Sequence, residues 1–435
     1  MESNVSFVET KIEDIITEIA MGPFGSNIKK DSFVSSGVPV LNGSNLTGFS
    51  TNDRDLRYVT EDKAKSLGKA LAARGDVVVT HRGTLGQIAY IPMNSRYENY
   101  IISQSQFRLK CDKTKVLPEY LVYYFHTPLG KWKLLSNTTQ TGVPALGRPT
   151  STFKNLYIEL PSIEQQSKIL KIIQPLQDKI SLNQQINDYL AELRNALVKE
   201  RISNTLEQGI GNWRVVPLKN VAQIQSGYSY KSAEFVADSN IGMLGIKNFN
   251  RNGSFRSDGF KPLKPEKAKP AQYVALGEIV VAHTDLTQNA DIIGRAIQVI
   301  DSGGYEQMVA SLDLVKVTSS DDSISNEFLA ALLGTEDFHN HCLGYVNGTT
   351  VLHLGKKALS EYQLKIPEDM TIISELDDAF KSIAQQQAVL IRESRNLERI
   401  RDTLLPKLMS GEIDVTEVEV PTQLNNHLCD CLYVS

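Results

Sequence analysis

The sequence has little cysteine, no long apolar run and no apolar leader. Four cysteines in 435 residues do not form a disulfide framework, so we expect reduced thiols and a cytoplasmic protein. No stretch reaches the roughly 18 apolar residues of a membrane span. Residues 1–11 mix charged and apolar side chains, so a secretory signal is not expected. The hydrophobic share of 41% and the charged share of 22% are typical of a globular chain.

The sequence also lacks the short motifs of common catalytic sites. It contains no Gly-x-x-x-x-Gly-Lys-Ser/Thr loop, no Gly-x-Gly-x-x-Gly turn, no His-Glu-x-x-His and no Cys-x-x-Cys. No two prolines are adjacent, which excludes the Asn/Asp-Pro-Pro-aromatic loop of amino-methyltransferases. We therefore predict no catalytic residue and no metal site. Three weaker groups do not form a convincing site: Glu9 with Lys11, His339 and His341 beside Cys342, and Cys429 and Cys431 near His427.

The net charge of −4 argues against a protein that binds nucleic acid unaided. Residues 1–160 carry 19 Lys and Arg against 15 Asp and Glu, whereas residues 368–435 carry 6 against 13. A role in nucleic-acid binding therefore predicts partners that bring positive charge of their own.

The chain contains one unit twice. The string Gly75-Asp-Val-Val-Val-Thr-His81 recurs as Gly277-Glu-Ile-Val-Val-Ala-His283, and residues 141–161 recur without a gap as residues 347–367. The offset of about 200 residues is far outside the 20–50-residue period of solenoids. The sequence therefore predicts a duplicated unit of domain size.

Each copy has a globular part and a helical part. The globular parts hold short β-branched runs between Gly, Asn, Asp and Pro clusters, and helices are expected near residues 119–135 and 325–342. The helical parts have almost no glycine. The predicted boundaries are 1–160 (globular), 161–207 (helical), 208–367 (globular), 368–413 (helical) and 414–435 (tail).

The two helical parts share a heptad seam with 3-4 spacing. Two matched helices in one chain predict an antiparallel coiled coil, in which polar positions such as Asn183 and Gln387 set the register. Alternatively, each helix packs only on its own domain. Pro175 is expected to kink or restart the first helix, and Pro406 to kink or end the second. The seam residues are Ile173, Leu176, Ile180, Asn183, Asn187, Leu190, Arg194 and Leu197, and then Phe380, Ile383, Gln387, Leu390, Ser394, Leu397, Arg401 and Leu404.

The predicted fold class is α+β: two pseudo-repeated, globular mixed α/β domains separated by two long helices that pair as an antiparallel coiled coil. A seam over residues 173–197 would be about 36 Å long at 1.5 Å per residue. One turn of B-DNA is about 34–36 Å. Two similar domains on such a spacer suit a two-site ligand, of which DNA is one.

Loops after matched strands carry residue types that read base edges. Arg suits guanine, Asn and Gln suit adenine, and Thr contacts the thymine methyl. A turn role remains open for Asn45 and Asn248, a surface role for Arg82 and Arg251, and a structural role for His81 and His283. The first-copy candidates are Lys29, Lys30, Asn45, His81, Arg82, Thr84, Gln140 and Arg148. The second-copy candidates are Tyr230, Lys231, Lys247, Asn248, Arg251, His283, Thr284, Asn347 and Thr349.

Four short strings stand at the starts and ends of the predicted parts. They are Gly22-Pro-Phe-Gly-Ser26, Pro161-Ser-Ile-Glu-Gln-Gln166, Gly211-Asn-Trp213 and, most specific, Leu404-Leu-Pro-Lys-Leu-Met-Ser-Gly-Glu-Ile413. In this order, and with the duplication, they resemble the specificity subunits of type I restriction-modification systems. The resemblance covers nearly the whole chain, to about residue 415, and leaves the tail without a counterpart.

The resemblance implies a subunit with no catalysis and no cofactor of its own. Each globular part would be a target-recognition domain that reads one half of an asymmetric, bipartite double-stranded DNA target. The helices would set the spacer and dock two methyltransferase subunits, which would bind S-adenosylmethionine and methylate adenine N6. Restriction subunits would add the nuclease that depends on ATP and Mg²⁺. The second copy departs from the family at Asp285, whose charge would repel a phosphate.

Two other classes of function remain open. One is a self-sufficient DNA-modifying enzyme, which would act on DNA as the purified chain alone with S-adenosylmethionine or Mg²⁺. The other is a two-headed scaffold that binds proteins and never DNA. A salt-dependent shift of duplex DNA by the assembled complex would argue against the scaffold.

Overall fold

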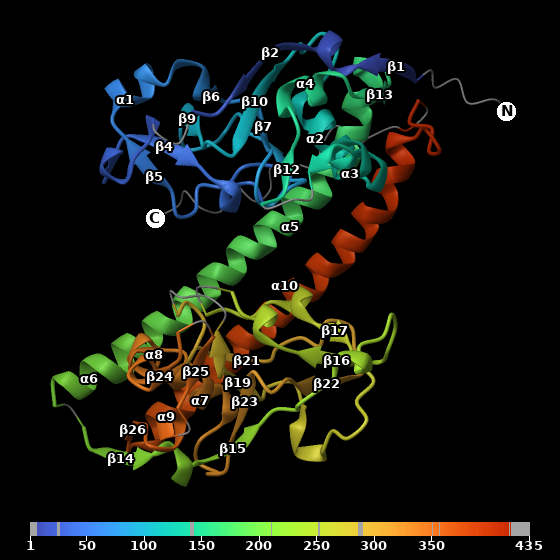
Figure 1. Cartoon of the computed structure of the whole chain (residues 1–435). Coiled ribbons are helices and arrows are strands. Elements are labelled where there is room, and N and C mark those ends of the chain that lie inside the picture. The colour runs from blue at the N-terminus through green and yellow to red at the C-terminus, as the bar shows by residue number, and fades with distance from the viewer. Residues whose placement is uncertain are drawn as a thin grey trace. The chain divides into compact units, whose positions relative to one another are not determined.

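A computed structural model describes residues 7–23, 27–139, 143–209, 211–250, 253–285, 290–349, 351–355, 357–416 and 418. The chain forms two compact units. Unit 1 consists of Met1–Asp178 with Leu397–Ser435, and unit 2 consists of Lys179–Asn396. Each unit therefore contains one globular part and one end of each long helix (Figure 1).

Unit 1 is built on two small sheets. The four-stranded sheet β2-β10-β7-β8 is antiparallel, and the five-stranded sheet β3-β5-β4-β9-β6 contains one parallel pair, β4 with β9. Strands β1 and β13 form one further pair, and β11 and β12 another. The strands are β1 Val8–Lys11, β2 Ile16–Met21, β3 Phe33–Val34, β4 Val38–Leu41, β5 Arg57–Val59, β6 Leu71–Ala73, β7 Val77–Thr80, β8 Ile88–Tyr90, β9 Asn99–Ile102, β10 Gln106–Cys111, β11 Thr138–Thr139, β12 Ala145–Leu146 and β13 Tyr157–Leu160. The short helices are α1 Glu61–Ser66, α2 Pro118–His126, α3 Pro128–Leu135 and α4 Pro149–Lys154.

Unit 2 repeats this plan. Sheet β15-β23-β19-β21 matches the four-stranded sheet of unit 1, and sheet β17-β16-β22-β18 again contains one parallel pair, β16 with β22. Strand β14 pairs with β26, and β20-β25-β24 form a further sheet. The strands are β14 Trp213–Pro217, β15 Ala222–Ser226, β16 Ile241–Leu244, β17 Lys261–Pro262, β18 Tyr273–Val274, β19 Ile279–Ala282, β20 Thr284–Asp285, β21 Ala296–Gln298, β22 Gln307–Ala310, β23 Leu314–Ser319, β24 Val346–Asn347, β25 Leu352–Leu354 and β26 Gln363–Pro367. The short helices are α7 Asn326–Leu333, α8 Glu336–Leu343 and α9 Lys357–Ser360.

The core strands of both copies follow from their sequences. Val77, Val79 and Ile88 are fully buried in the main core of unit 1, and Val78 belongs to a second core on the other face of the sheet. A strand that is buried on both faces of its sheet has a continuous run of β-branched residues. Residues 77–80 and 279–282 therefore lack the alternation of apolar and polar residues that is typical of a half-exposed strand.

Helices lie in both segments where they were expected, near 119–135 and near 325–342, and each segment contains two of them. Thr127 ends α2 and caps α3, where its Oγ1 accepts from the backbone N–H of Gly130 at 3.0 Å. Pro128 then occupies the first helical position, where a missing N–H costs nothing. In unit 2 Thr335 caps α8 in the same way, accepting from Phe338 at 3.4 Å.

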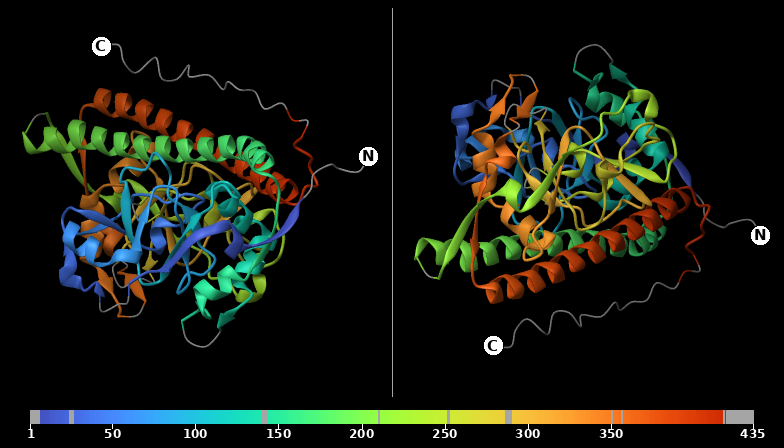
Figure 2. Two further views of the ribbon diagram at one scale, coloured as in Figure 1. Left: turned by 90° about the horizontal axis from the view of Figure 1, so that it is seen from above. Right: turned by 90° about the horizontal axis from the view of Figure 1, so that it is seen from below.

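The two long helices, α5 Ile163–Val198 and α10 Met370–Met409, pair within each unit (Figure 2). In unit 2 Asn183 Nδ2 donates to Ser394 Oγ at 3.2 Å, and Gln387 Nε2 donates to the carbonyl of Asn187 at 3.2 Å. Residue numbers therefore fall along α10 as they rise along α5. These contacts confirm the predicted antiparallel pairing through the seam. A π-helical turn, Lys199–Ser203, and α6 Asn204–Glu207 continue α5.

Proline does not interrupt either long helix. Pro175 lies inside α5, so of the expected kink or restart the restart does not occur. Pro406 lies three residues before the end of α10. A proline inside a helix costs about 3 kcal/mol. Ile169, Leu170 and Ile173 of α5 are buried in the main core of unit 1, and this tertiary packing holds the helix through the proline.

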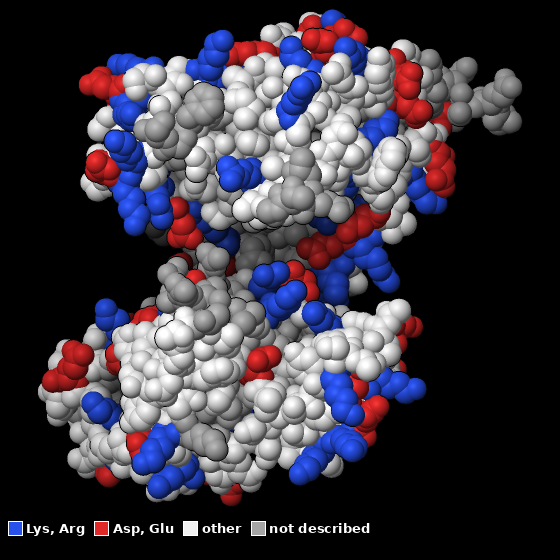
Figure 3. Space-filling view, viewed as in Figure 1, with Lys and Arg blue, Asp and Glu red and all other residues white. Residues whose placement is uncertain are grey.

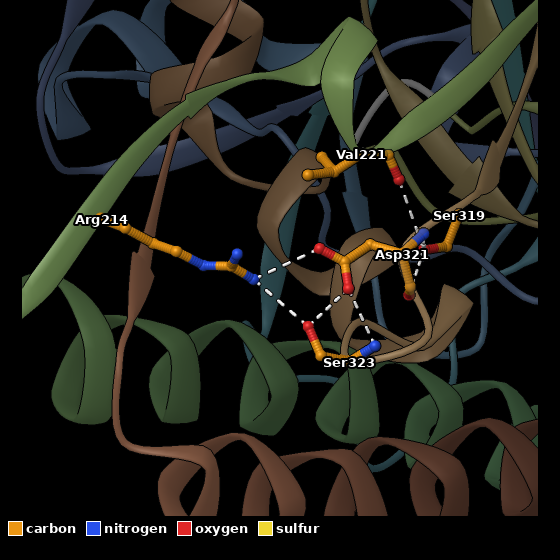
Figure 4. A network of polar contacts seen from close by, with 5 residues as sticks. All are labelled: Arg214, Val221, Ser319, Asp321 and Ser323. Atoms are coloured by element: carbon orange, nitrogen blue, oxygen red, sulfur yellow. Dashed lines mark hydrogen bonds and ion pairs between the residues drawn. The ribbon is translucent and has the colours of Figure 1, made fainter.

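A polar network fixes the segment before α7 in unit 2 (Figure 4). Asp321 Oδ1 accepts from the backbone N–H of Ser323 at 2.9 Å, and Arg214 of β14 donates to Asp321 Oδ2 at 3.3 Å. The hydrogen bonds from Ser323 are the main reason that the pKa of Asp321 lies below its usual range. In the part of the chain that the structure describes, every helix is too short or too polar to cross a membrane.

Candidate nucleic-acid interface

In unit 1 the segment after β7 is held by the β11–β12 hairpin. The backbone N–H of Leu146 donates to the carbonyl of His81 at 2.8 Å. Arg82 pairs with Ala145 as an isolated β-bridge. The hairpin therefore fixes the backbone from which Arg82 projects.

Two further loops meet the segment after β7. Gln87 Nε2 donates to the carbonyl of Gly43 at 2.9 Å, and Gln87 Oε1 accepts from Thr80 Oγ1 at 3.1 Å. The backbone N–H of His81 donates to the carbonyl of Ser105 at 2.8 Å. The loops after β4, β7 and β9 therefore converge with the hairpin, and we call them the converging loops of unit 1.

Several first-copy candidates present exposed side chains. Arg82 and Thr84 are exposed in the segment after β7. Arg148 is exposed just before α4 and has a left-handed φ of 46°. Lys29 and Lys30 are exposed in the turn that precedes β3. Arg and Lys at such positions can contact phosphates or, for Arg, the guanine edge.

The two histidines that end the matched strands are half-buried. His81 Nε2 lies 3.2 Å from the carbonyl oxygen of Gln104. Burial lowers the pKa of His81 below its usual value. Burial is also the main reason that the pKa of His283 is lowered, and the charge of His353 adds to the effect. Both histidines are therefore neutral near neutral pH, so they suit a neutral hydrogen bond better than a phosphate contact.

Unit 2 repeats the convergence of loops. The backbone N–H of His283 donates to the carbonyl of Asp313 at 2.7 Å, and that of Leu354 donates to the carbonyl of His283 at 2.9 Å. The backbone N–H of Ser311 donates to the carbonyl of Leu244 at 2.8 Å. The loops after β16, β19 and β22 thus meet the β24–β25 hairpin, as their counterparts do in unit 1. We call them the converging loops of unit 2.

The acidic residue that departs from the family pattern faces inward. Asp285 is 2% exposed, and its Oδ2 accepts from the backbone N–H of Ile292 at 2.8 Å. Thr284 is also buried, and its Oγ1 donates to Asp313 Oδ1 at 2.8 Å. The expected repulsion of a phosphate by Asp285 is therefore reduced, because its carboxylate is buried and hydrogen-bonded. Thr284 therefore has a structural role in place of the predicted DNA contact.

Asn45 and Asn248 are fully buried turn residues, which corrects the prediction of DNA contacts there. Asn45 Nδ2 donates to the carbonyls of Asn52 and Arg54 at 3.1 and 2.8 Å, and its Oδ1 accepts from the backbone N–H of Asn42 at 2.9 Å. Asn248 is bound in the same manner within its own loop. Buried and hydrogen-bonded to the protein, neither side chain faces a ligand.

The other second-copy candidates are spread over unit 2. Tyr230 is half-buried with its ring 5.1 Å from that of Phe235, and Lys231 is exposed, 3.5 Å from Glu266. Lys247 is exposed beside the turn of Asn248. Two further candidates, Asn347 and Thr349, are exposed at the β24–β25 hairpin. Gln140 and Arg251 lie outside the described residues.

Sequence reasoning missed His353. It is exposed on β25, and the register places it opposite Thr284 of β20, next to His283. The ungapped repeat aligns it with Gly147 and so gave no signal. The matched hydrogen bonds from Leu146 to His81 and from Leu354 to His283 place it instead at the position of Ala145, which pairs with Arg82 in unit 1. The two units therefore present different chemistry from the same hairpin position.

Charges on the face drawn in Figure 3 are mixed on each unit, without one continuous basic band. Among the described residues no three His, Cys, Asp or Glu side chains gather as metal ligands would. Cys111 and Cys342 are buried and free, and burial raises the pKa of each thiol to about 12. Neither thiol is therefore a nucleophile at neutral pH. Cys429, Cys431 and His427 lie outside the described residues.

Comparisons with known proteins agree with the twofold plan. The family described as the type I restriction modification DNA specificity domain matches residues 6–192 and again residues 210–392. The chain is 25% identical over 331 residues to the type I restriction enzyme MjaVIII specificity subunit of Methanocaldococcus jannaschii, covering 72% of this chain and 75% of that protein. It is 23% identical over 474 aligned residues to the HindI specificity subunit of Haemophilus influenzae, covering 91% of this chain and 99% of that protein.

A solved structure has a similar fold. The crystal structure of the S subunit of a type I restriction-modification system from M. genitalium matches with a TM-score of 0.56 and 15% identity, over 94% of this chain and 97% of that one. At this identity the likeness concerns the fold. Because the family matches twice and over most of the sequence, the chain belongs to the family of type I restriction-modification DNA specificity domains and contains two copies of that domain.

Proposed function

We propose that the protein is the DNA-recognition subunit of a type I restriction-modification complex, in which each unit reads one half of a bipartite double-stranded target. The observation that carries the proposal is the repeated convergence of loops on two copies of a DNA specificity domain. In each set of converging loops, exposed polar side chains project from backbone that is hydrogen-bonded at the ends of strands. Such an arrangement suits the reading of base edges, because recognition needs side chains held at fixed positions.

The two half-sites are expected to differ in sequence. At equivalent positions after the matched strands, unit 1 has the exposed Arg82, and unit 2 has the buried Thr284. The hairpins differ as well, with Ala145 in unit 1 and His353 in unit 2. Two readers with different donors and acceptors do not favour the same bases.

The paired helices serve, in this proposal, as the spacer and as the docking site for two methyltransferase subunits. Leu182, Tyr189 and Leu193 are exposed on α5 and lie outside the seam. Large apolar side chains that recur at near-heptad spacing suit a partner helix. The partner subunits would bind S-adenosylmethionine and methylate adenine. Restriction subunits would bind ATP and Mg²⁺, and this chain would act without catalysis.

A domain exchange tests the proposal. Residues 1–160 would be replaced by the matching domain of a relative with a known target, and the complex would be expressed with its methyltransferase subunits. Only one half-site of the methylated sequence is expected to change. A change in both halves would contradict independent reading by the two units, and unaltered methylation would deny unit 1 any part in recognition.

A further inference from the structure

Helix α3 of unit 1 carries an exposed apolar face beside the converging loops. Trp132 is 67% exposed and Leu129 is 51% exposed, and they lie three residues apart on the helix. Leu135, one turn further on, is also exposed. A Cβ atom built on Gly86 would lie 3.8 Å from both Cδ atoms of Leu135, so the face borders the segment after β7. Residues three and four apart share one side of a helix.

The outward direction of this face is fixed by the packing of the helix. Gly130 lies so close to α2 that a Cβ atom there would come 2.1 Å from the carbonyl oxygen of Tyr124. Leu134 is buried in the core of unit 1, and Lys133 Nζ donates to the carbonyl of Tyr157 at 2.7 Å. Because Gly130 and Leu134 face inward, Leu129 and Trp132 face solvent. Exposing a tryptophan to water is unfavourable, so the position suits a partner.

The charge around this face points to the class of partner. The segment 127–154 contains four Lys and Arg and no Asp or Glu. Lys131 is exposed between Leu129 and Trp132, and Arg148 is exposed beyond the hairpin. Val143, in the same segment, is 56% exposed. Lys154 Nζ lies 3.3 Å from Glu13 Oε1, so Lys131 and Arg148 are the relevant cations. A surface that combines cations with large apolar side chains suits the phosphates and sugars of a nucleic acid.

Unit 2 has no such face at the equivalent place. Thr127 and Thr335 cap α3 and α8 in the same way, which aligns the two helices. Asp337 then stands where unit 1 has Leu129, and the exposed Asn340 stands where it has Trp132. The segment equivalent to 127–154, residues 335–360, contains two acidic residues, Glu336 and Asp337. Unit 2 keeps an exposed Leu343 where unit 1 has Leu135, but the exposed pair Leu129 and Trp132 is a property of unit 1 and not of the repeated fold.

We propose that Trp132 and Leu129 form a DNA contact of unit 1 separate from the converging loops, in which the two side chains pack against sugar and base edges of the duplex beside the half-site. Lys131 supplies a phosphate contact that holds this surface on the DNA. The contact rests on the proposed function. It adds affinity and sensitivity to DNA shape on one side of the target only, because unit 2 lacks the tryptophan.

A single-tryptophan protein tests the contact directly. The chain has two tryptophans, so Trp213→Phe leaves Trp132 as the only one. The variant would be produced with 5-hydroxytryptophan, assembled with unlabelled methyltransferase subunits, and excited where ordinary tryptophan does not absorb. Addition of target duplex is expected to change the emission of residue 132 and to protect it from acrylamide, while a gel shift records DNA binding independently.

Affinity measurements complete the test. Trp132→Ala is expected to weaken binding of the target duplex by about tenfold, as for loss of one aromatic contact to a base, and Trp132→Phe to restore most of it. Lys131→Gln should lower the salt dependence of binding by about one phosphate contact. The matched control is Asn340→Ala at the equivalent position of unit 2, which should bind as the parent does.

The outcomes separate this inference from the proposed function. If the complex shifts DNA while residue 132 keeps its emission and its accessibility, the inference is wrong and the proposed function stands. Protection of residue 132 on assembly alone, without further change on adding DNA, would assign the surface to a protein partner and would also overturn the inference. A complex that never binds DNA would overturn both.

Discussion

Replacing Arg401 by Met is expected to destabilise the paired helices far more than replacing Arg194 by Met. The two arginines occupy the same seam position in the two helices. Arg401 Nη1 donates to Gln177 Oε1 at 2.6 Å, and its guanidinium lies 5.1 Å from the centre of the Phe49 ring. The ring of Phe49 in turn stacks on that of Tyr123 at 4.3 Å. Arg401 therefore packs against the stacked pair of Phe49 and Tyr123 in unit 1.

Arg194 differs from Arg401 in its surroundings. Its Nε is buried without a hydrogen bond among the described residues, and burial lowers the pKa of the side chain. It borders a cavity of about 50 Å³ that is also lined by Gly253 and Gln298. Gly334, at the end of α7, approaches the guanidinium, where the carbonyl end of a helix favours a cation.

The magnitudes follow from these contacts. A hydrogen bond from a charged donor contributes about 1.5–3 kcal/mol, and a cation–π contact about 0.5–2 kcal/mol. Arg401→Met should therefore cost about 2–5 kcal/mol. Arg194→Met removes a partly buried charge that, among the described residues, is supported by the end of a helix, so the change should be within about 1 kcal/mol of zero. A difference of about 2 kcal/mol corresponds to about a thirtyfold difference in local opening.

Hydrogen exchange followed by mass spectrometry is the suitable assay, because it reports the opening of α5 and α10 near each arginine separately. Peptides around Arg401 should exchange much faster in Arg401→Met than in the parent. Peptides around Arg194 should hardly change in Arg194→Met. Equal acceleration in the two variants would refute the reasoning, since it would mean that Arg194 is as well paired as Arg401.

Three further predictions concern the spacer, the pH response and the docking face. Inserting seven residues after Leu190, and seven in the facing part of α10, should lengthen the paired helices by about 10 Å. The spacer of the methylated target should then grow by about three base pairs. An unchanged spacer would show that the helices do not set its length. Burial lowers the pKa of His126 from 6.5 to about 4, so the unfolded chain takes up a proton at higher pH than the folded one. Between about pH 7 and about pH 5 unit 1 should thus lose about 2 kcal/mol of its free energy of unfolding through His126. His126→Gln should remove this contribution in urea titrations and leave that of His81, whose pKa burial also lowers. Replacing Leu182, Tyr189 and Leu193 together by serine should weaken binding of the methyltransferase subunits at least tenfold in calorimetry, and full affinity would place the docking site elsewhere.

The duplication, the core strands and the paired helices could be predicted from the sequence because each leaves a local periodic signal. The 3-4 spacing predicts which residues lie in the seam, and two of them, Asn183 and Ser394, do contact each other. The split between α2 and α3 was missed, although Thr127 followed by Pro128 is a good cap and first position. Apolar spacing continued across that split and concealed it.

The candidate site was only partly predictable, since a polar residue after a strand looks the same whether it turns inward or outward. Asn45 turns inward because its side-chain amide donates hydrogen bonds to the backbone carbonyls of Asn52 and Arg54. Arg82 turns outward on a segment fixed by a hairpin more than fifty residues later in the chain. Such partners are tertiary, so residue type and spacing do not identify them.

The central claim is that two different readers on one spacer specify the DNA target. Its most direct test is to express the chain with its methyltransferase subunits in a host that lacks adenine methylation, and to map methyladenine across the genome. The claim predicts one motif with two unlike halves separated by a fixed number of unspecified bases. A palindromic motif, a variable spacer, or no methylation from a stable complex would contradict it.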